Sequence, residues 1–313
     1  MFITRANEFV IHPVLQNLAI YYPLGGLVGH MLAPKVDVGE GASDGYLFKF
    51  EKSNIQGNLD DIRAYGTRAS SFNWKTSKDS YNCEEHSKEK SIDWREFKKW
   101  ARYLDVAKIT QEVGLEVLLT NYEARVATLF TTTANYASSS YYTTLTGTDQ
   151  WTDFVNSDPE GVIEDAREQV ALNAVEPNAI AMPVQVWRRV RRHPAIRAMI
   201  LEQNNNQLTE DGFPAKLFGL NAYYPGSRRV TSMPGVTETI ARIWSDYVWV
   251  GVVNPRPTLR TMSFAYTLVE EGLKSEVYED KAAKSDVVRI QHQVSDEKIV
   301  CNTAGYLIAD VLG

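Results

Sequence analysis

The sequence predicts an α+β fold in a chain long enough to bury a sizeable core. One segment after residue 91 carries apolar residues at steps of three and four, which is typical of a helix. The segment after Leu217 contains short apolar runs bounded by turn residues, which indicate strands. Helices and strands are mixed without the regular β-α-β order of a parallel sheet. Of the 313 residues, 44% are hydrophobic and 23% are charged, as in ordinary globular proteins.

The first 35 residues are apolar but cannot form one regular element. Pro13 and Pro23 interrupt them, together with the glycines of "GGLVGH". That glycine cluster lacks the Lys-Ser/Thr pair of a phosphate-binding loop, so we interpret it as a bend. We expect residues 1–35 to form an extended arm that packs on another surface.

Residues 36–90 are polar, with aromatic side chains in alternation. The stretch "GYLFKFEKSNIQG" places Tyr46, Phe48 and Phe50 on one side of a strand. The following "DIRAYGTRASSFNWK" adds further aromatic residues: Tyr65, Phe72 and Trp74. We interpret the region as a long two-stranded hairpin with little core of its own. Because such a ribbon is marginal in water, we expect it to lean on a partner.

A long helix is expected from about Ser91 or Asp93, either of which can cap it. Its apolar stripe extends over roughly 50 Å and consists of Phe97, Trp100, Leu104, Ala107, Leu118, Tyr122 and Leu129. A second stripe lies on nearly the opposite side: Val106, Ile109, Val113, Val117 and Ala124. Two stripes predict a helix that is covered from two directions over its C-terminal half, as a spine between layers.

A second helix is predicted at "SDPEGVIEDAREQVALN", where Asp158 can cap it and Pro159 takes its first position. The stretch "NAIAM" reads as a short buried strand, and Pro183 begins another helix. Later strands are predicted at "SDYVWVGVVN", "TLRTMSFAYTLVEE", "DVVRIQHQVS" and "EKIVCNTAGYLIADVL".

The basic stretch "QVWRRVRRHPAIR" divides into two faces on a helical wheel. Val184 and Val190 lie near Trp187 on the apolar face. The opposite face carries three arginines: Arg188, Arg189 and Arg192. No aromatic stacking platform or basic tail accompanies them, so we expect them to meet solvent or acidic groups, not nucleic acid.

The composition argues against several classes of protein. The net charge of -6 disfavours a surface that tracks phosphates throughout. Cys83 and Cys301 lack the spacing of a zinc site or a disulfide framework. The longest apolar runs are strand-sized, so we expect no membrane span and a soluble protein.

The sequence contains no GxSxG, HExxH, Walker or dinucleotide motif. The "CEEH" stretch from Cys83 to His86 lacks further ligands and is interpreted as a solvated loop. We therefore predict no catalytic residue, metal site or cofactor. A hydrolytic enzyme built around His193 or His86 stays open as a less favoured alternative.

The order of these elements resembles a known family. The stretches "NAIAMPVQVWRRVRRHPAIRAMI", "IARIWSDYVWVGVV", "RTMSFAYTL" and "KIVCNTAGYLIADVL" are similar in order to segments of tailed-bacteriophage major capsid proteins, the Hong Kong 97-like capsid fold. The apolar arm and the polar hairpin before a spine helix agree with it. The resemblance covers nearly the whole chain.

The resemblance implies a division of the chain. Residues 1–35 would be the N-terminal arm and 36–90 the extended loop, a β-hairpin that lies across a neighbour. Residues 91–159 would form the peripheral domain with the spine helix. Residues 160–250 would form the axial domain, and 251–313 would return to strands of the peripheral domain.

The resemblance also implies a structural protein that self-assembles into an icosahedral shell around double-stranded DNA. It implies hexamers and pentamers, portal and scaffolding partners, a possible decoration protein, and assembly in the host cytoplasm for the virion. The candidate subunit contacts are Tyr46, Phe48, Phe50, Tyr65, Phe72, Trp74, Arg188, Arg189 and Arg192. An encapsulin-like nanocompartment shell, which encloses protein cargo, is the related alternative.

Overall fold

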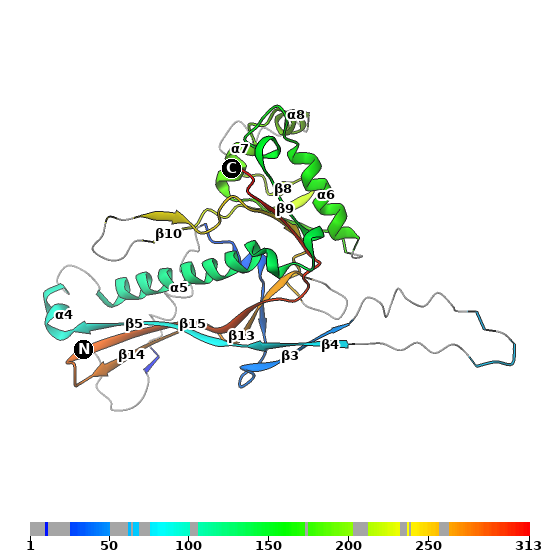
Figure 1. Ribbon diagram of the computed structural model, residues 1–313. Coiled ribbons are helices and arrows are strands. Elements are labelled where there is room, and N and C mark those ends of the chain that lie inside the picture. The colour runs from blue at the N-terminus through cyan, green and yellow to red at the C-terminus, as the bar shows by residue number, and fades with distance from the viewer. Residues whose placement is uncertain are drawn as a thin grey trace.

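The computed structural model describes residues 10–11, 26–50, 62–63, 65–68, 76–100, 106–172, 175–202, 212–231, 237, 239–256 and 263–313. Figure 1 shows an elongated lower layer, in which a long helix lies along a sheet, and a smaller unit of helices and strands above its right-hand end. Two thin hairpins project from this body: β3–β4 at the bottom and β10–β11 on the left. Helices and strands are mixed, as the α+β prediction required.

The larger sheet is centred on the longest strand, β15. Its path is β1-β14-β15-β13-β2, and β5 also pairs with β15. The strands are β1 (Val10–Ile11), β2 (Lys35–Asp37), β5 (Glu84–Asp93), β13 (Ala265–Glu271), β14 (Lys274–Asp280) and β15 (Ser285–Ile299). Residues 84–90, which we expected in the extended loop, thus belong to a ten-residue strand of this sheet. The interaction is non-local, since β5 and β15 are separated by about two thirds of the chain.

The helical stretch that follows β5 begins where the Asp93 cap predicts. Strand β5 continues to Asp93, whose carboxylate accepts a hydrogen bond from the backbone N–H of Arg95 at 2.7 Å. Helix α4 (Trp94–Trp100) and helix α5 (Val106–Thr131) follow. Helix α5, which we call the spine helix, lies along β15 and β5. Gly114 is the point of closest approach, because a Cβ there would lie 2.4 Å from Ile290.

The smaller sheet has the order β6-β16-β12-β7-β9-β8. Its strands are β6 (Tyr142–Thr144), β7 (Ala179–Ala181), β8 (Lys216–Leu217), β9 (Leu220–Tyr223), β12 (Val248–Gly251) and β16 (Gly305–Ala309). Strand β16 therefore returns to this sheet, whereas we expected the final strand in the peripheral domain. The side chains of β16 are mostly buried and show little alternation between buried and exposed, because the strand lies between two neighbouring strands.

Helices cover the smaller sheet. They are α6 (Pro159–Ala171), α7 (Val184–Val190) and α8 (Pro194–Glu202). Asp158 caps α6 by accepting from the N–H of Gly161, and Pro159 takes the first position, as predicted. The short helix α2 (Gly29–Leu32) and three single-turn 3-10 segments (Thr133–Asn135, Ser139–Tyr141 and Gly147–Asp149) complete the helical elements of the described residues.

Two short hairpins stand apart from both sheets. Strands β3 (Asp44–Phe50) and β4 (Thr76–Asn82) pair only with each other within the described residues, and so do β10 (Arg228–Val230) and β11 (Ile240–Arg242). The expected hairpin thus exists, although its second strand follows "DIRAYGTRASSFNWK" instead of lying within it.

The main core lies where the spine helix, the larger sheet and the smaller sheet meet. Phe130, at the end of α5, is fully buried. Its ring packs edge-on against three others, with centroid distances of 4.9 Å to Trp249, 5.0 Å to Phe264 and 6.1 Å to Trp244. A second core under α6 and α7 contains the buried Trp151 and Trp187.

Candidate assembly interfaces

The β3–β4 hairpin exposes the aromatic side chains that the strand pattern predicts. Tyr46 is 64% exposed and Phe48 is 61% exposed. They share one face, where the Lys78 ammonium lies 5.7 Å and 5.6 Å from the two ring centroids. The intervening Leu47 points the other way and packs against the body. The hairpin therefore presents an aromatic and cationic surface that the described residues leave uncovered.

The root of this hairpin is held on β15. The Lys298 ammonium forms an ion pair with Asp79 at 3.0 Å, and the Asp296 carboxylate accepts from the N–H of Asn82 at 3.1 Å. Cys83, just beyond β4, is a buried free thiol whose burial raises its pKa. These contacts fix the direction in which the hairpin leaves the sheet.

Only some of the other aromatic candidates lie among the described residues. Tyr65 is fully exposed. Phe50 is the last residue of β3, but its side chain lies outside the described part, as do Phe72 and Trp74 entirely. Their roles as subunit contacts stay predictions.

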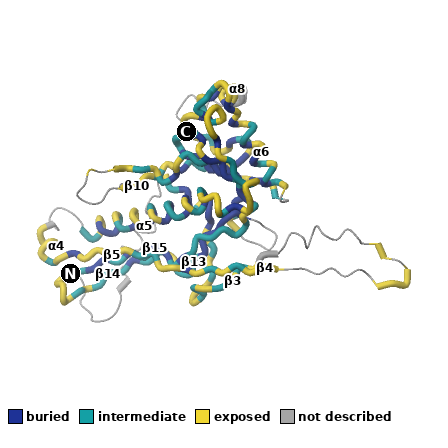
Figure 2. The backbone as a smooth tube through the Cα atoms, in the orientation of Figure 1, coloured by how far each residue is buried: buried dark blue, intermediate teal, exposed yellow. Residues whose placement is uncertain are grey.

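Three members of the second apolar stripe of the spine helix are exposed within the described residues, contrary to our expectation, whereas Val106 packs against a core cluster and Ala124 is half-buried. Ile109, Val113 and Val117 are 40%, 54% and 42% exposed. They follow each other at four-residue steps along α5, and Figure 2 shows exposed turns (yellow) along the upper side of this helix. The expectation was wrong because the sheet packs on one side of α5 only, where Leu115 and Leu118 are buried.

The three arginines of the basic stretch are exposed, as the helical wheel predicts. Trp187 and Val190 are fully buried on the opposite side of α7. Gln185 anchors α7 to the chain after β11, since its amide donates to the carbonyl oxygens of Trp244 at 3.1 Å and Ser245 at 2.6 Å. Because Arg188, Arg189 and Arg192 follow Gln185 by three, four and seven positions, they share its face.

Sequence reasoning missed two further arginines in this region. Arg228 and Arg242 are directly paired across β10–β11, and both are exposed. Burial and the neighbouring charges of Arg228 and Arg188 lower the pKa of Arg242. Arg242 also donates to the side-chain oxygen of Gln185, which brings the hairpin against α7. We call Arg188, Arg189, Arg192, Arg228 and Arg242 the arginine face. The doublet "SRRV" was a sequence signal for Arg228.

The two histidines of the enzymatic alternative lie in different places. His193 follows α7 and is buried, with its Nε2 3.4 Å from the Ser157 hydroxyl. Ser157 is itself buried, and within the described residues no carboxylate contacts the Nδ1 of His193. His86 lies in β5, where burial and then the Arg125 charge lower its pKa. The structure does not unite them in the nucleophile, base and acid arrangement of a hydrolase.

In the "CEEH" stretch, Glu84 to His86 belong to strand β5 and Cys83 is buried just before it, so the stretch is not the expected solvated loop. Nowhere in the described ranges do three or more His, Cys, Asp or Glu side chains gather as metal ligands would. No helix among the described residues has the length and apolar character needed to cross a membrane.

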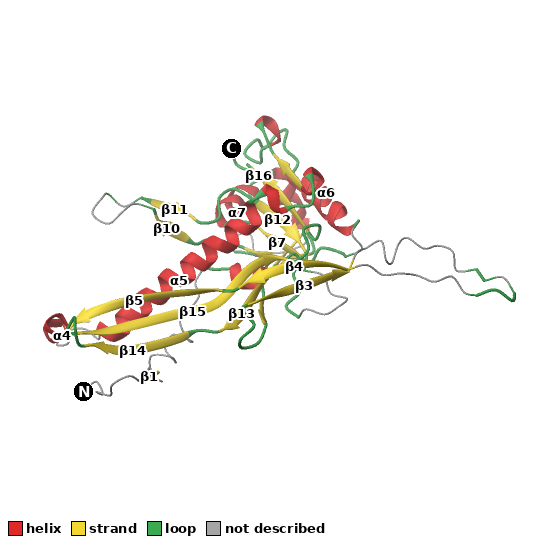
Figure 3. Cartoon of the chain, turned by 60° about the horizontal axis from the view of Figure 1, so that its bottom comes forward, coloured by secondary structure: helices red, strands yellow, loops and turns green. Residues whose placement is uncertain are grey.

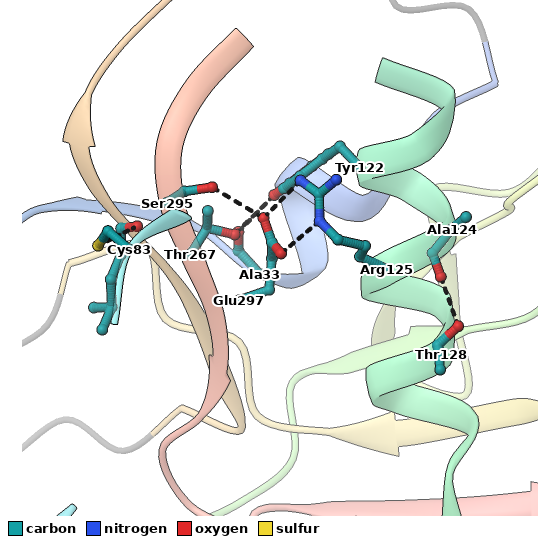
Figure 4. A network of polar contacts seen from close by, with 10 residues as sticks. Ala33, Cys83, Tyr122, Ala124, Arg125, Thr128, Thr267, Ser295 and Glu297 are labelled. Atoms are coloured by element: carbon teal, nitrogen blue, oxygen red, sulfur yellow. Dashed lines mark hydrogen bonds and ion pairs between the residues drawn. The ribbon is translucent and has the colours of Figure 1, made fainter. Parts of the chain in front are cut away.

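A polar network joins the spine helix to the sheet and to the arm (Figure 4). The Arg125 guanidinium makes a bidentate ion pair with Glu297 of β15 at 2.8 Å and 3.1 Å. The Tyr122 hydroxyl contacts the Thr267 hydroxyl at 2.8 Å, and Thr267 donates to the carbonyl oxygen of Ala33 at 3.1 Å. Burial raises the pKa of Tyr122 far above its usual value.

Glu123 forms the tightest junction of this network. Its buried carboxylate accepts from the backbone N–H groups of Val28 at 3.1 Å and Gly29 at 2.7 Å, and from the indole N–H of Trp244 at 2.6 Å. Burial raises the pKa of Glu123, and these three donors oppose that shift. A Cβ on Gly29 would lie 2.7 Å from the carboxylate, so only glycine allows this approach.

Comparisons with known proteins show which fold this arrangement has. No family model matches the sequence. In solved structures, a phage-related protein from Bordetella bronchiseptica superposes with a TM-score of 0.73 at 23% identity, over 97% of this chain and 99% of that one. The capsid of cyanophage P-SCSP1u gives 0.62 at 11% identity, over 99% and 93%. The chain has the Hong Kong 97-type capsid fold.

The sequence comparison agrees with the capsid fold over the whole chain. The major capsid protein of Burkholderia phage BcepMu is 26% identical, over 97% of both chains. That of Pseudomonas phage JBD67 is 25% identical, over 76% of each chain. The resemblance predicted from the element order is confirmed. An encapsulin from Synechococcus elongatus has the same fold, with a TM-score of 0.53 at 11% identity over 99% and 92%, so the fold alone does not separate the two kinds of shell.

One pH dependence follows from a buried histidine of this capsid fold. Burial, and then the charges of Lys35, Arg125 and His86, lower the pKa of His292 to about 3. The unfolded chain binds that proton near pH 6.5, so the contribution of His292 to stability is present above pH 6.5 and is lost as the pH falls toward 3. When the pH falls from 8 to 5, the unfolded chain protonates His292 and the folded chain does not. This difference is expected to lower the unfolding free energy by about 2 kcal/mol.

The measurement compares the His292→Phe variant with the parent by urea unfolding of the unassembled chain at both pH values. The variant keeps an aromatic ring beside Tyr122, whose centroid lies 5.4 Å from that of His292. Its unfolding free energy should fall less between pH 8 and pH 5. Equal losses in the two proteins would contradict the assignment.

Proposed function

We propose that the chain is a major capsid protein of a tailed phage and assembles with copies of itself into an icosahedral shell around double-stranded DNA. The whole-length similarity to phage major capsid proteins supports the class. We further propose that the shell is built of hexamers and pentamers, with portal and scaffolding proteins as partners and a decoration protein as a possible addition. Assembly would take place in the host cytoplasm, and the chain would have no catalytic role.

The observation that carries this proposal is the β3–β4 hairpin. It stands apart from both sheets and exposes Tyr46 and Phe48, while its root is fixed by the contacts of Lys298 and Asp296. A two-stranded ribbon with an aromatic face gains little stability alone, so it requires another surface. The extended loop at 36–90, with β5 excepted, is the segment we expect to lie across a neighbouring copy.

A surface that suits this hairpin exists on the same chain. The exposed stripe of α5, formed by Ile109, Val113 and Val117, is apolar. We propose that it belongs to the area on which the neighbour's hairpin lies. The proposed peripheral domain then contains α5 and the larger sheet, and the axial domain contains the smaller sheet with α6, α7, α8 and also β16.

The net charge of -6 supports a wall that encloses DNA without gripping it. The experiment is electron microscopy of the purified chain, alone and with a scaffolding protein. Closed shells are expected under at least one condition. Small monodisperse particles under every condition would contradict the proposal.

Removal of the exposed aromatic surface tests the hairpin directly. The Tyr46→Ser, Phe48→Ser double variant is expected to lower the yield of shells roughly tenfold or more, because buried aromatic side chains dominate many protein interfaces. The unfolding free energy of the unassembled chain should change by about 0.5 kcal/mol or less, since both side chains are exposed. Sedimentation measures the yield, and urea unfolding measures the stability.

The matched control for the hairpin is the Tyr46→Phe, Phe48→Tyr exchange, which keeps two aromatic rings on the same face. It should assemble nearly as the parent does. If the serine variant assembled equally well, this face would not be a subunit contact.

The second candidate is a nanocompartment shell, which the structural likeness to an encapsulin favours. The two functions differ in the contents of the particle. Shells purified from the native source should contain DNA if the chain is a phage capsid protein, and a folded protein cargo if it is an encapsulin. Nuclease-protected DNA of a single length would decide for the phage.

A further inference from the structure

The arginine face carries positive charges that the described residues leave unbalanced. Arg228 and Arg242 lie directly opposite each other on neighbouring strands, and Arg188 of α7 is close enough to perturb Arg242. Like charges directly opposite on two strands are destabilising. Within the described residues no carboxylate forms an ion pair with any of these three. The β10–β11 hairpin that carries Arg228 and Arg242 has only three residues in each strand, so it gains little stability of its own.

The opposite flank of the same unit carries negative charges. Helix α6 lies on one side of the smaller sheet, and β10–β11 projects on the other side, in both views (Figures 1 and 3). The buried side of α6 packs on the sheet through Ile163 and Ala166. Its outer side exposes four carboxylates, which we call the carboxylate face: Glu160, Glu164, Asp165 and Glu168.

The carboxylate face is only partly neutralised within the chain. Glu164 forms an ion pair with Arg167 at 2.6 Å. Glu168 lies in the last turn of α6, which contains no basic residue. A negative charge at this end of a helix opposes the helix dipole and costs stability. Positive groups from outside the chain would remove that cost.

We propose that the arginine face of one copy docks on the carboxylate face of the next copy around a ring of the shell. This inference rests on the proposed function and names the partner of the arginines. Because the two faces lie on opposite flanks, the contact is head-to-tail, and repeated rotation closes it into a ring. The β3–β4 hairpin points toward the side on which α6 lies. The neighbouring copy whose arginine face docks on this α6 is therefore also the copy on which this hairpin lies.

Charge complementarity of this kind sets which surfaces meet and in which register, more than it sets the raw affinity. Arginine suits the role because its planar fork can bind a carboxylate with two hydrogen bonds. A duplex would instead need a positive footprint, whereas the flank opposite the arginines is acidic and the net charge is -6. A second copy of the chain therefore fits the arginine face better than nucleic acid does.

The test reverses each face separately and then both together. One variant carries Arg188→Glu and Arg242→Glu, and the other carries Asp165→Lys and Glu168→Lys. Each alone is expected to lower the yield of shells about tenfold or more, because like charges meet at every contact of the ring. The chain that carries all four substitutions should recover the yield to within about threefold of the parent, since opposite charges meet again. Sedimentation and electron microscopy measure the yield.

Coexpression of the two reversed chains gives a second and sharper readout. Their faces are complementary only when the two chains alternate around a ring, and alternation needs an even number of copies. Mixed chains should therefore form six-membered rings more readily than five-membered rings. The Arg188→Lys, Arg242→Lys variant keeps both charges and serves as the control, with near-parental assembly expected.

The outcomes separate this inference from the proposed function. If the parent chain forms shells and either reversed variant assembles as well as the parent does, the docking is wrong while the capsid function stands. The docking is also wrong if the four-substitution chain stays as defective as the single-face variants. Normal shells with less retained DNA would assign the arginine face to nucleic acid. If the parent forms no shells with or without scaffold, the proposed function fails, and the docking fails with it.

Discussion

Replacing Glu123 by alanine is expected to lower the unfolding free energy by about 4 kcal/mol. The substitution leaves two backbone N–H groups, of Val28 and Gly29, and the indole N–H of Trp244 without their shared acceptor in a buried place. An unsatisfied buried donor costs roughly 1–3 kcal/mol, and part of that is recovered because a buried charge is removed. The loss should be visible in urea unfolding of the unassembled chain at neutral pH.

The Glu123→Gln variant tests how far the loss depends on the acceptor oxygens of the carboxylate. Glutamine keeps the volume and one acceptor oxygen, but its amide N–H₂ then faces one of the former donors. About half of the alanine effect is expected. Because Glu123 joins the residue 28–29 segment, the spine helix and Trp244, both variants should also reduce assembly. If alanine and glutamine each cost less than about 1 kcal/mol, the junction does not stabilise the fold as the contacts imply.

Replacing Phe130 by alanine is the other change with a large expected effect, again about 4 kcal/mol of unfolding free energy. The ring is fully buried at the end of α5 and packs edge-on against Trp244, Trp249 and Phe264. These neighbours belong to both sheets or adjoin them, so the cavity opens at the junction of the two layers. Thermal unfolding and near-ultraviolet circular dichroism, which reports on packed tryptophans, measure the loss.

Phe130→Leu is the matched variant, because it keeps an apolar side chain at the same point. It should cost about 1.5 kcal/mol or less. A similar loss for leucine and alanine would show that the site depends on the aromatic ring contacts and not on the filled volume. Loss below about 1 kcal/mol for alanine would contradict the central position assigned to Phe130.

Much of the fold could be predicted because local patterns reported on local structure. Asp158 and Pro159 mark the start of α6, and the buried side of α7 follows from the spacing of Trp187 and Val190. A cap, a proline and a helical period act within a few residues, so one segment contains the whole signal. The order of such segments was also sufficient to indicate the capsid fold.

The misplacements share one physical cause. Residues 84–90 became β5 because β15, about 200 positions later, offers a pairing edge. The final strand β16 lies between β12 and β6 in the smaller sheet for the same reason. Strand pairing satisfies backbone groups at long range, and no local pattern states which partner a strand will find.

The sequence by itself determined several elements and faces of this protein: the exposed aromatic face of β3 at Tyr46 and Phe48, the arginine side of α7, and the cap that begins α6. Only the tertiary structure decided which faces stay exposed and which charges lie together on one flank. It leaves the Ile109, Val113 and Val117 stripe of α5 open, and it brings Arg228 and Arg242 beside Arg188 on the flank opposite α6. A helical wheel or a strand alternation states which residues share a side, whereas only the packed chain shows which sides the chain itself covers.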